Sequence, residues 1–142
     1  MIRVGIDVEG MEALEAALEG FTAEMMPLAA KGLKQGLLMV AKDAKLLAPV
    51  DKGALRNSIR TEVKEYATFA VGEVSATAEH AVYVEMGTGA RGAASGGDGS
   101  GMSVTYTPDH PGMAAQPYLY PAYKINKDRV LNAIKRAVRG GM

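Results

Sequence analysis

The sequence contains no cysteine and no tryptophan, and it has only two histidines and two phenylalanines. Without cysteine, the chain offers no disulfide framework, no thiolate nucleophile and no cysteine-bound zinc site. It also lacks any run of 18 or more apolar residues, which excludes a transmembrane helix. These absences remove three classes from consideration: disulfide-stapled domains, zinc fingers and membrane-spanning proteins.

Recognisable catalytic patterns are also missing. Neither a Walker A loop nor a G-x-S-x-G elbow is present, and His80 and His110 have no partner at a useful spacing. Residues 87–92 match G-x-G-x-x-G, but the following residues, 93–99, do not predict the helix that must hold the pyrophosphate. We interpret the match as a chance product of a glycine-rich stretch, and we expect no cofactor.

Three glutamates were considered as paired catalytic carboxylates: Glu73, Glu79 and Glu85. Their surroundings in the sequence favour solvated positions. With only two histidines, a metal site would have to be built from carboxylates alone. The sequence therefore predicts neither an enzyme nor a metal-binding protein.

Charge is balanced in total but unevenly distributed. The 142 residues carry 16 basic and 16 acidic side chains, and their hydrophobic fraction of 48% is typical of one globular domain spanning 1–142. Residues 1–30 have net charge −5, 31–60 have +5, 61–123 have −5 and 124–142 have +5. Such blocks can neutralise one another within a monomer, or they can pair between subunits and fix their register. A dedicated nucleic-acid patch is not indicated.

Hydrophobic periodicity predicts an α+β fold, with an antiparallel sheet packed against one long helix and a C-terminal helix. In chain order, the patterns predict a strand at 2–8, a short helix at about 10–20, a helix of about 21 residues ending before Pro49, a hairpin formed by 59–66 and 69–76, and a helix at about 118–138. Residues 77–86 fit either a helical turn or a strand.

The long helix has the clearest signal. From Met26 to Leu47, apolar residues recur at alternating spacings of four and three, which places them on one helix face. Pro27 suits the first turn, and Pro49 pushes its predecessor out of the helical region. Gly32 and Gly36 form a small-residue face. That face either lets another backbone approach closely or packs against the chain's own sheet.

Seven of the 17 glycines fall within residues 87–101. This composition is typical of a flexible loop, which we place at about 87–103. Val104 and Tyr106 then predict a short strand returning from the loop. A structureless loop of this length is usually functional or disordered.

Several side chains are candidates for contacts with partners. Tyrosines with a polar tip are enriched at interfaces, and three of them lie between 118 and 123. Helical geometry predicts that Tyr118 anchors the helix start to the core while Tyr120 and Tyr123 face outward. The full set of candidate interface residues is Arg56, Asn57, Glu85, Thr88, Arg91, Tyr120 and Tyr123.

Three motifs occur in a fixed order. Residues 48–59 read APVDKGALRNSI after the long helix, residues 81–89 read AVYVEMGTG before the glycine-rich stretch, and residues 116–122 read QPYLYPA at the start of the last helix. This order resembles the neck and tail-component proteins of tailed bacteriophages, the gene-product-ten-like family of lambdoid siphophages.

The resemblance implies a structural subunit without catalytic activity. It further implies a homo-oligomeric ring in the neck at the head–tail junction, with six copies as the first expectation and twelve as the second. The role would be connector, stopper, tail completion or terminator. Neighbouring phage neck and tail proteins would be the partners, and DNA would pass through the channel without sequence-specific binding. The location would be the virion, after assembly in the host cytoplasm and without a membrane.

Two other readings remain open from the residues alone. The first is an intracellular protein-binding module that acts as a monomer or dimer. The second is a small hydrolase, which would need carboxylates converging in one cleft. Particle mass separates a ring from a binding module, and a structure tests for the cleft.

Overall fold

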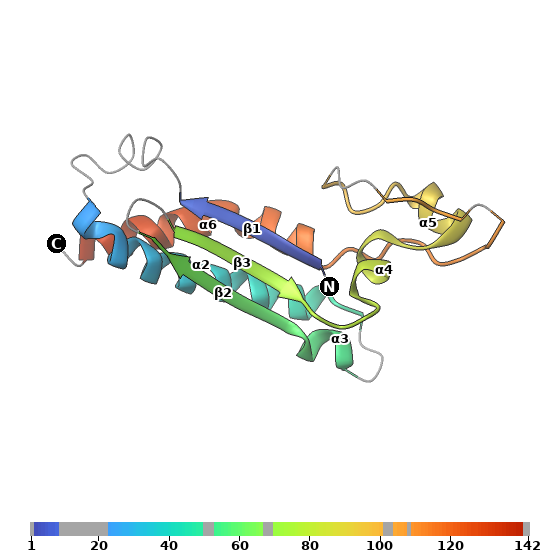
Figure 1. The fold of residues 1–142 in the computed structure, drawn as a ribbon, viewed down its shortest axis with the longest axis horizontal. Helices are drawn as coiled ribbons and strands as arrows, with labels where there is room; N and C mark the ends of the chain where they lie inside the picture. Colours follow the sequence, from blue (N-terminus) through green and yellow to red (C-terminus); the bar gives the residue numbers. More distant parts are fainter. Residues whose placement is uncertain are drawn as a thin grey trace.

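The computed structural model describes residues 2–8, 23–49, 53–66, 70–100, 104–107 and 109–140. The helix expected at about 10–20 lies outside these residues. The described elements are β1 (Ile2–Val8), η1 (Ala23–Met25), α2 (Met26–Leu47), α3 (Ala54–Asn57), β2 (Ile59–Glu65), β3 (Ala70–Ala76), α4 (Ala81–Met86), α5 (Gly89–Ser95) and α6 (Leu119–Gly140). Figure 1 shows a sheet backed by the two long helices, with α4 and α5 beyond one end of the sheet. The predicted α+β class is confirmed.

Helix α2 forms where the apolar seam predicted it. Pro27 lies in its first turn, and Leu33, Leu37 and Ala44 on the seam are completely buried. The helix ends at Leu47 because Ala48, which precedes a proline, adopts an extended conformation with ψ of 131°. Burial of this face holds the helix against the rest of the core.

The sheet is antiparallel with the strand order β1-β3-β2. The predicted strand at 2–8 and the predicted hairpin are both present. In the central strand β3, every second residue from Ala70 to Ala76 is buried, which is the alternation expected of a strand with one face on a core. Gly72 lies on that buried face, and a Cβ there would come within 2.7–3.0 Å of Leu37 and Leu33 on α2. The missing side chain lets α2 pack closely on the sheet.

The two long helices approach each other through glycine. A Cβ on Gly32 would lie 2.6 Å from the Cα of Ile134, and a Cβ on Gly36 would lie 2.8 Å from the Cα of Val130. The small-residue face of α2 therefore does receive another backbone. That backbone is α6 of the same chain, not the sheet.

Residues 81–117, which we call the arm, lie past the end of the sheet near the start of α6 (Figure 1). The ambiguous stretch before the glycine-rich region is helical from Ala81 to Met86. Two expectations for the glycine-rich region are wrong. Gly89–Ser95 form the short helix α5 inside the expected loop, and residues 104–107 form no strand. Tyr106 instead donates a hydrogen bond from its hydroxyl to the carbonyl of Met86, at 2.7 Å.

Candidate assembly surfaces

Glu85 attaches the arm to helix α6. Its side chain is completely buried, although the sequence analysis placed it in solvent as an interface candidate. One carboxylate oxygen, Oε1, accepts hydrogen bonds from the backbone N–H groups of Tyr118 and Leu119, each at 2.9 Å. The other, Oε2, accepts one from the N–H of Tyr120 at 3.1 Å. The expectations that Glu85 is solvated and that it contacts a partner directly are therefore both wrong. Its side chain instead links α4 to the start of α6 within the subunit.

Glu85 takes the place of a capping residue that the sequence just before α6 lacks. The first N–H groups of a helix have no partner within the helix, and a Ser, Thr, Asp or Asn usually caps them. Gln116, Pro117 and Tyr118 precede α6 and include none of these residues. Glu85 supplies the acceptor from more than thirty residues away, and its negative charge also favours the positive end of the helix dipole.

Burial raises the pKa of Glu85 above its ordinary value of 4.5. A side-chain hydrogen bond with Asp98 raises the pKa further, while the three backbone N–H donors lower it without reversing the shift. Asp98 also accepts a hydrogen bond from the N–H of Ser100 at 2.8 Å. The residues just after α5 thus lie close to the carboxyl group of Glu85.

Tyr118 lies in the core, as predicted from helix geometry. It is completely buried, and its hydroxyl donates to the carbonyl of Ala81 at 3.2 Å. Burial raises the pKa of this phenol, and the nearby charge of Glu85 adds to the increase. Tyr120 and Tyr123 are half-buried with ring centroids 6.3 Å apart, and Tyr123 also packs against the core. They present less surface than a fully outward-facing pair would.

The arm has its own backbone hydrogen bonds. The N–H of Thr88 donates to the carbonyl of Met113 at 2.8 Å, and the N–H of Met113 returns to the carbonyl and hydroxyl of Thr88 at 3.0 Å each. The N–H of Arg91 donates to the carbonyl of Pro111 at 2.9 Å, while the Arg91 side chain is exposed. Thr88 is thus a structural residue of the arm, and Arg91 remains accessible to a partner.

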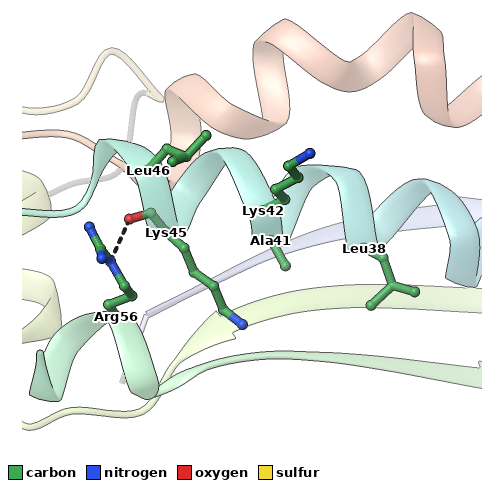
Figure 2. Close-up of a pocket in the computed structure, with 6 residues that line it drawn as sticks. All are labelled: Leu38, Ala41, Lys42, Lys45, Leu46 and Arg56. Carbon is green, nitrogen blue, oxygen red and sulfur yellow. Dashed lines mark hydrogen bonds between the residues drawn. The ribbon is translucent and has the colours of Figure 1, made fainter.

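A second surface is an open groove of about 300 Å³ on the outer side of α2, close to α3. Its α2 residues recur at i, i+3, i+4, i+7 and i+8, so they share one helix face. On this face, Leu38 is 53% exposed and Leu46 is 69% exposed. The lining, drawn in Figure 2, is Leu38, Ala41, Lys42, Lys45, Leu46 and Arg56.

The structure places the two α3 candidates differently. The guanidinium of Arg56 donates from Nε to the carbonyl of Lys45 at 2.9 Å, so α3 is tied to the end of α2 and its cation lies at the groove (Figure 2). Asn57 is exposed but does not line the groove. Leu55 on α3 and Ile59 at the start of β2 are buried and fix this segment to the core. Arg56 thus belongs to the groove and Asn57 to the exposed side of α3, while the other candidates lie on the arm and at the start of α6.

Sequence reasoning missed a buried polar link between the long helices. Asn126 is completely buried, and its Nδ2 donates to a carboxylate oxygen of Asp43 at 2.7 Å and to the carbonyl of Ala122 at 2.8 Å. The signal was present in the sequence. Asn126 falls four residues after Ala122 and four before Val130, in phase with the apolar seam of the last helix.

Within the described ranges, no three histidine, aspartate or glutamate side chains gather closely enough to hold a metal ion. In the same part of the chain, neither long helix combines the length and apolar character needed to cross a membrane.

A comparison with protein families finds a match over the first part of the chain. The family model described as "Bacteriophage HK97-gp10, putative tail-component" matches residues 12–87, more than half of the chain. The matched range contains α2, the hairpin and α4, together with Glu85 and the groove, and it ends where the arm turns at Gly87. No curated protein and no solved structure matches the chain.

Proposed function

The chain belongs to the bacteriophage HK97-gp10 family of phage tail components, and from this premise we propose that it is a ring-forming structural subunit at the head–tail junction. The family match over residues 12–87 carries the proposal, because this family is structural and its description places it in the tail. The specific tier is connector, stopper, tail completion or terminator.

Two dissimilar surfaces of the subunit support a ring. A head-to-tail contact joins different surfaces of successive subunits, and it closes into a ring when the rotation between subunits permits. The groove on α2 and the arm beyond the sheet lie on different parts of the subunit, so the subunit offers distinct surfaces to its neighbours (Figures 1 and 2). We propose six copies, with twelve as the second expectation.

The partners in this proposal are other copies of the chain and neighbouring phage neck and tail proteins. DNA passes through the ring channel without base recognition, which is consistent with a chain of zero formal net charge. The site of action is the virion, and assembly takes place in the host cytoplasm. The subunit performs no catalysis in this role.

A second candidate is a protein-binding module that acts as a monomer or dimer. The observation in its favour is the groove, because an apolar depression with exposed leucines also suits a peptide from an unrelated protein. This role does not require a ring. Particle architecture therefore separates the two candidates.

Electron microscopy of the purified protein and of virions tests the proposal. We expect negatively stained ring-shaped particles with a central opening, and gold-labelled antibodies at the junction between head and tail. The control is the same antibody on virions assembled without this protein. Labelling confined to the host cell, with no rings and no virion signal, would contradict the proposal.

A further inference from the structure

The groove has the chemistry of a site for an acidic, amphipathic segment. It is lined by the apolar side chains of Leu38 and Leu46 and by the cationic side chains of Lys42, Lys45 and Arg56 (Figure 2). Among the residues that the structure describes, none that lines the groove carries a carboxylate. An occupant that covers the leucines and neutralises the cations must combine apolar side chains with several carboxylates.

This chain contains such a segment in residues 9–22, which lie outside the described residues. It alternates apolar and acidic side chains over two to three potential helical turns. The apolar members are Met11, Leu14, Leu18 and Phe21, and the acidic members are Glu9, Glu12, Glu15 and Glu19. We propose that this acidic segment of one subunit docks in the basic groove of its neighbour.

The fold makes docking within one chain impossible at ordinary chain dimensions. The segment starts after β1 ends at Val8 and must rejoin the chain at Ala23, where η1 begins. β1 ends and α2 begins toward the same end of the molecule, and α3 lies at the other end (Figure 1). Leu38–Leu46 lie 12 to 20 residues beyond the start of α2, about 18–30 Å along the helix.

Fourteen residues cannot travel to the groove, occupy it and return. A fully extended chain spans about 3.5 Å per residue, so seven residues reach roughly 25 Å from the end of β1. The other seven residues are needed to lead the chain back to the start of η1. Even the near end of the groove, about 18 Å along the helix, takes about five fully extended residues in each direction, which leaves about four residues, too few to cover both Leu38 and Leu46. A neighbouring subunit meets no such limit, so the contact forms between copies.

This inference rests on the proposed ring, and it identifies the surfaces that join one subunit to the next. The segment and the groove are different surfaces of the same chain, as a head-to-tail contact requires. The contact also pairs two of the four charge blocks in the sequence. The −5 block at the N-terminus supplies the segment, and the +5 block at 31–60 supplies the groove.

Mixing two charge-reversed variants tests the contact. One variant carries Lys42→Glu and Lys45→Glu in the groove, and the other carries Glu12→Lys, Glu15→Lys and Glu19→Lys in the segment. Each alone should need at least about tenfold more protein to assemble, because like charges then face each other. A 1:1 mixture should regain assembly, since every contact can again join opposite charges. The matched control, Lys31→Glu with Lys34→Glu on α2 outside the groove, should assemble normally.

Cross-linking provides a direct readout, because the native chain has no cysteine. Leu14→Cys and Leu46→Cys are made in separate chains, mixed and mildly oxidised. We expect the mixed disulfide dimer to exceed either homodimer. Rings that form without this cross-link, and without sensitivity to the charge reversals, would overturn the contact while leaving the ring intact. A wild-type protein that forms no ring would instead overturn the proposed function.

Discussion

Glu85 makes the attachment of the arm depend on one side chain. Its carboxylate is the acceptor for three successive backbone N–H groups at the start of α6. A buried N–H group that loses its partner costs about 1–3 kcal/mol. The arm and the first turn of α6 are therefore coupled through the Glu85 carboxylate.

Replacing Glu85 should destabilise the subunit in a graded way. Glu85→Ala removes both acceptor oxygens and all three hydrogen bonds, and it should lower the free energy of unfolding by on the order of 3 kcal/mol. Glu85→Gln keeps one oxygen for Tyr118 and Leu119 but presents an amide to the N–H of Tyr120, so a loss of about 1 kcal/mol is expected. Chemical denaturation measures both losses. Glu79→Ala, at a nearby exposed position, is the control, and equal losses at 79 and 85 would refute the capping role.

The raised pKa of Glu85 gives a defined pH dependence. The folded state binds this proton more tightly than the unfolded state, so the contribution to stability is full below the ordinary pKa of 4.5 and declines as the pH rises through the higher folded value. The difference in melting temperature between the wild type and Glu85→Gln should therefore shrink as the pH rises through this window, because only the wild type loses this contribution. Parallel curves for the two proteins would contradict the assignment.

Single residues also show where sequence reasoning reaches its limit. The position of Tyr118 in the core followed from helix geometry alone and is confirmed. Glu85 was interpreted as solvated because its burial depends on a helix start more than thirty residues away. A missing local cap before Leu119 was the available clue. Asn126 was likewise detectable only as a polar residue within an apolar seam.

At the scale of elements, the close packing of α2 on α6 depends on glycine. Both backbone neighbours of a Cβ at Gly32, the Cα of Ile134 and the carbonyl oxygen of Ala133, lie within 2.7 Å. Backbone atoms cannot rotate away as a side chain can. A larger residue at position 32 must therefore push α2 and α6 apart. Intrinsic helix propensity does not include the packing free energy that this separation loses.

Gly32→Ala should therefore lower stability even though it replaces glycine within a helix. Overpacking costs about 1–3 kcal/mol, whereas alanine regains at most about 1 kcal/mol of helix propensity. A thermal melt should show a lower midpoint. Gly140→Ala near the end of α6, where nothing lies within 4 Å of the added Cβ, should show no decrease. A stabilised Gly32→Ala variant would mean that the helices are not packed this closely.

Elements with strong periodicity were predictable, and the arm was not. The long helices and the hairpin each bury a regular apolar face, so their patterns mark them. The fold of the arm depends on glycines that permit close backbone approach. A Cβ on Gly92, for example, would lie 2.7 Å from the carbonyl carbon of Gly87. A glycine-rich composition by itself predicts a flexible loop, so the sequence did not predict helix α5.

For the whole molecule, the family match and the two outer surfaces lead to one account. The matched residues 12–87 contain the core helix, the hairpin and the groove, and the chain then adds the arm and α6. The core gives rigidity, and the groove and arm offer different surfaces to neighbours. This division of roles suits a structural subunit that repeats around an axis.

Native mass spectrometry of the full-length protein tests the central claim, assembly into a closed ring, most directly. Spectra are recorded over a range of protein concentrations at low ionic strength, because screening weakens exposed charge contacts. The account predicts one dominant species of six times the 14.9 kDa chain, or of twelve times as the second expectation, without intermediate open chains at high concentration. A protein that remains a monomer or dimer at every concentration would contradict it.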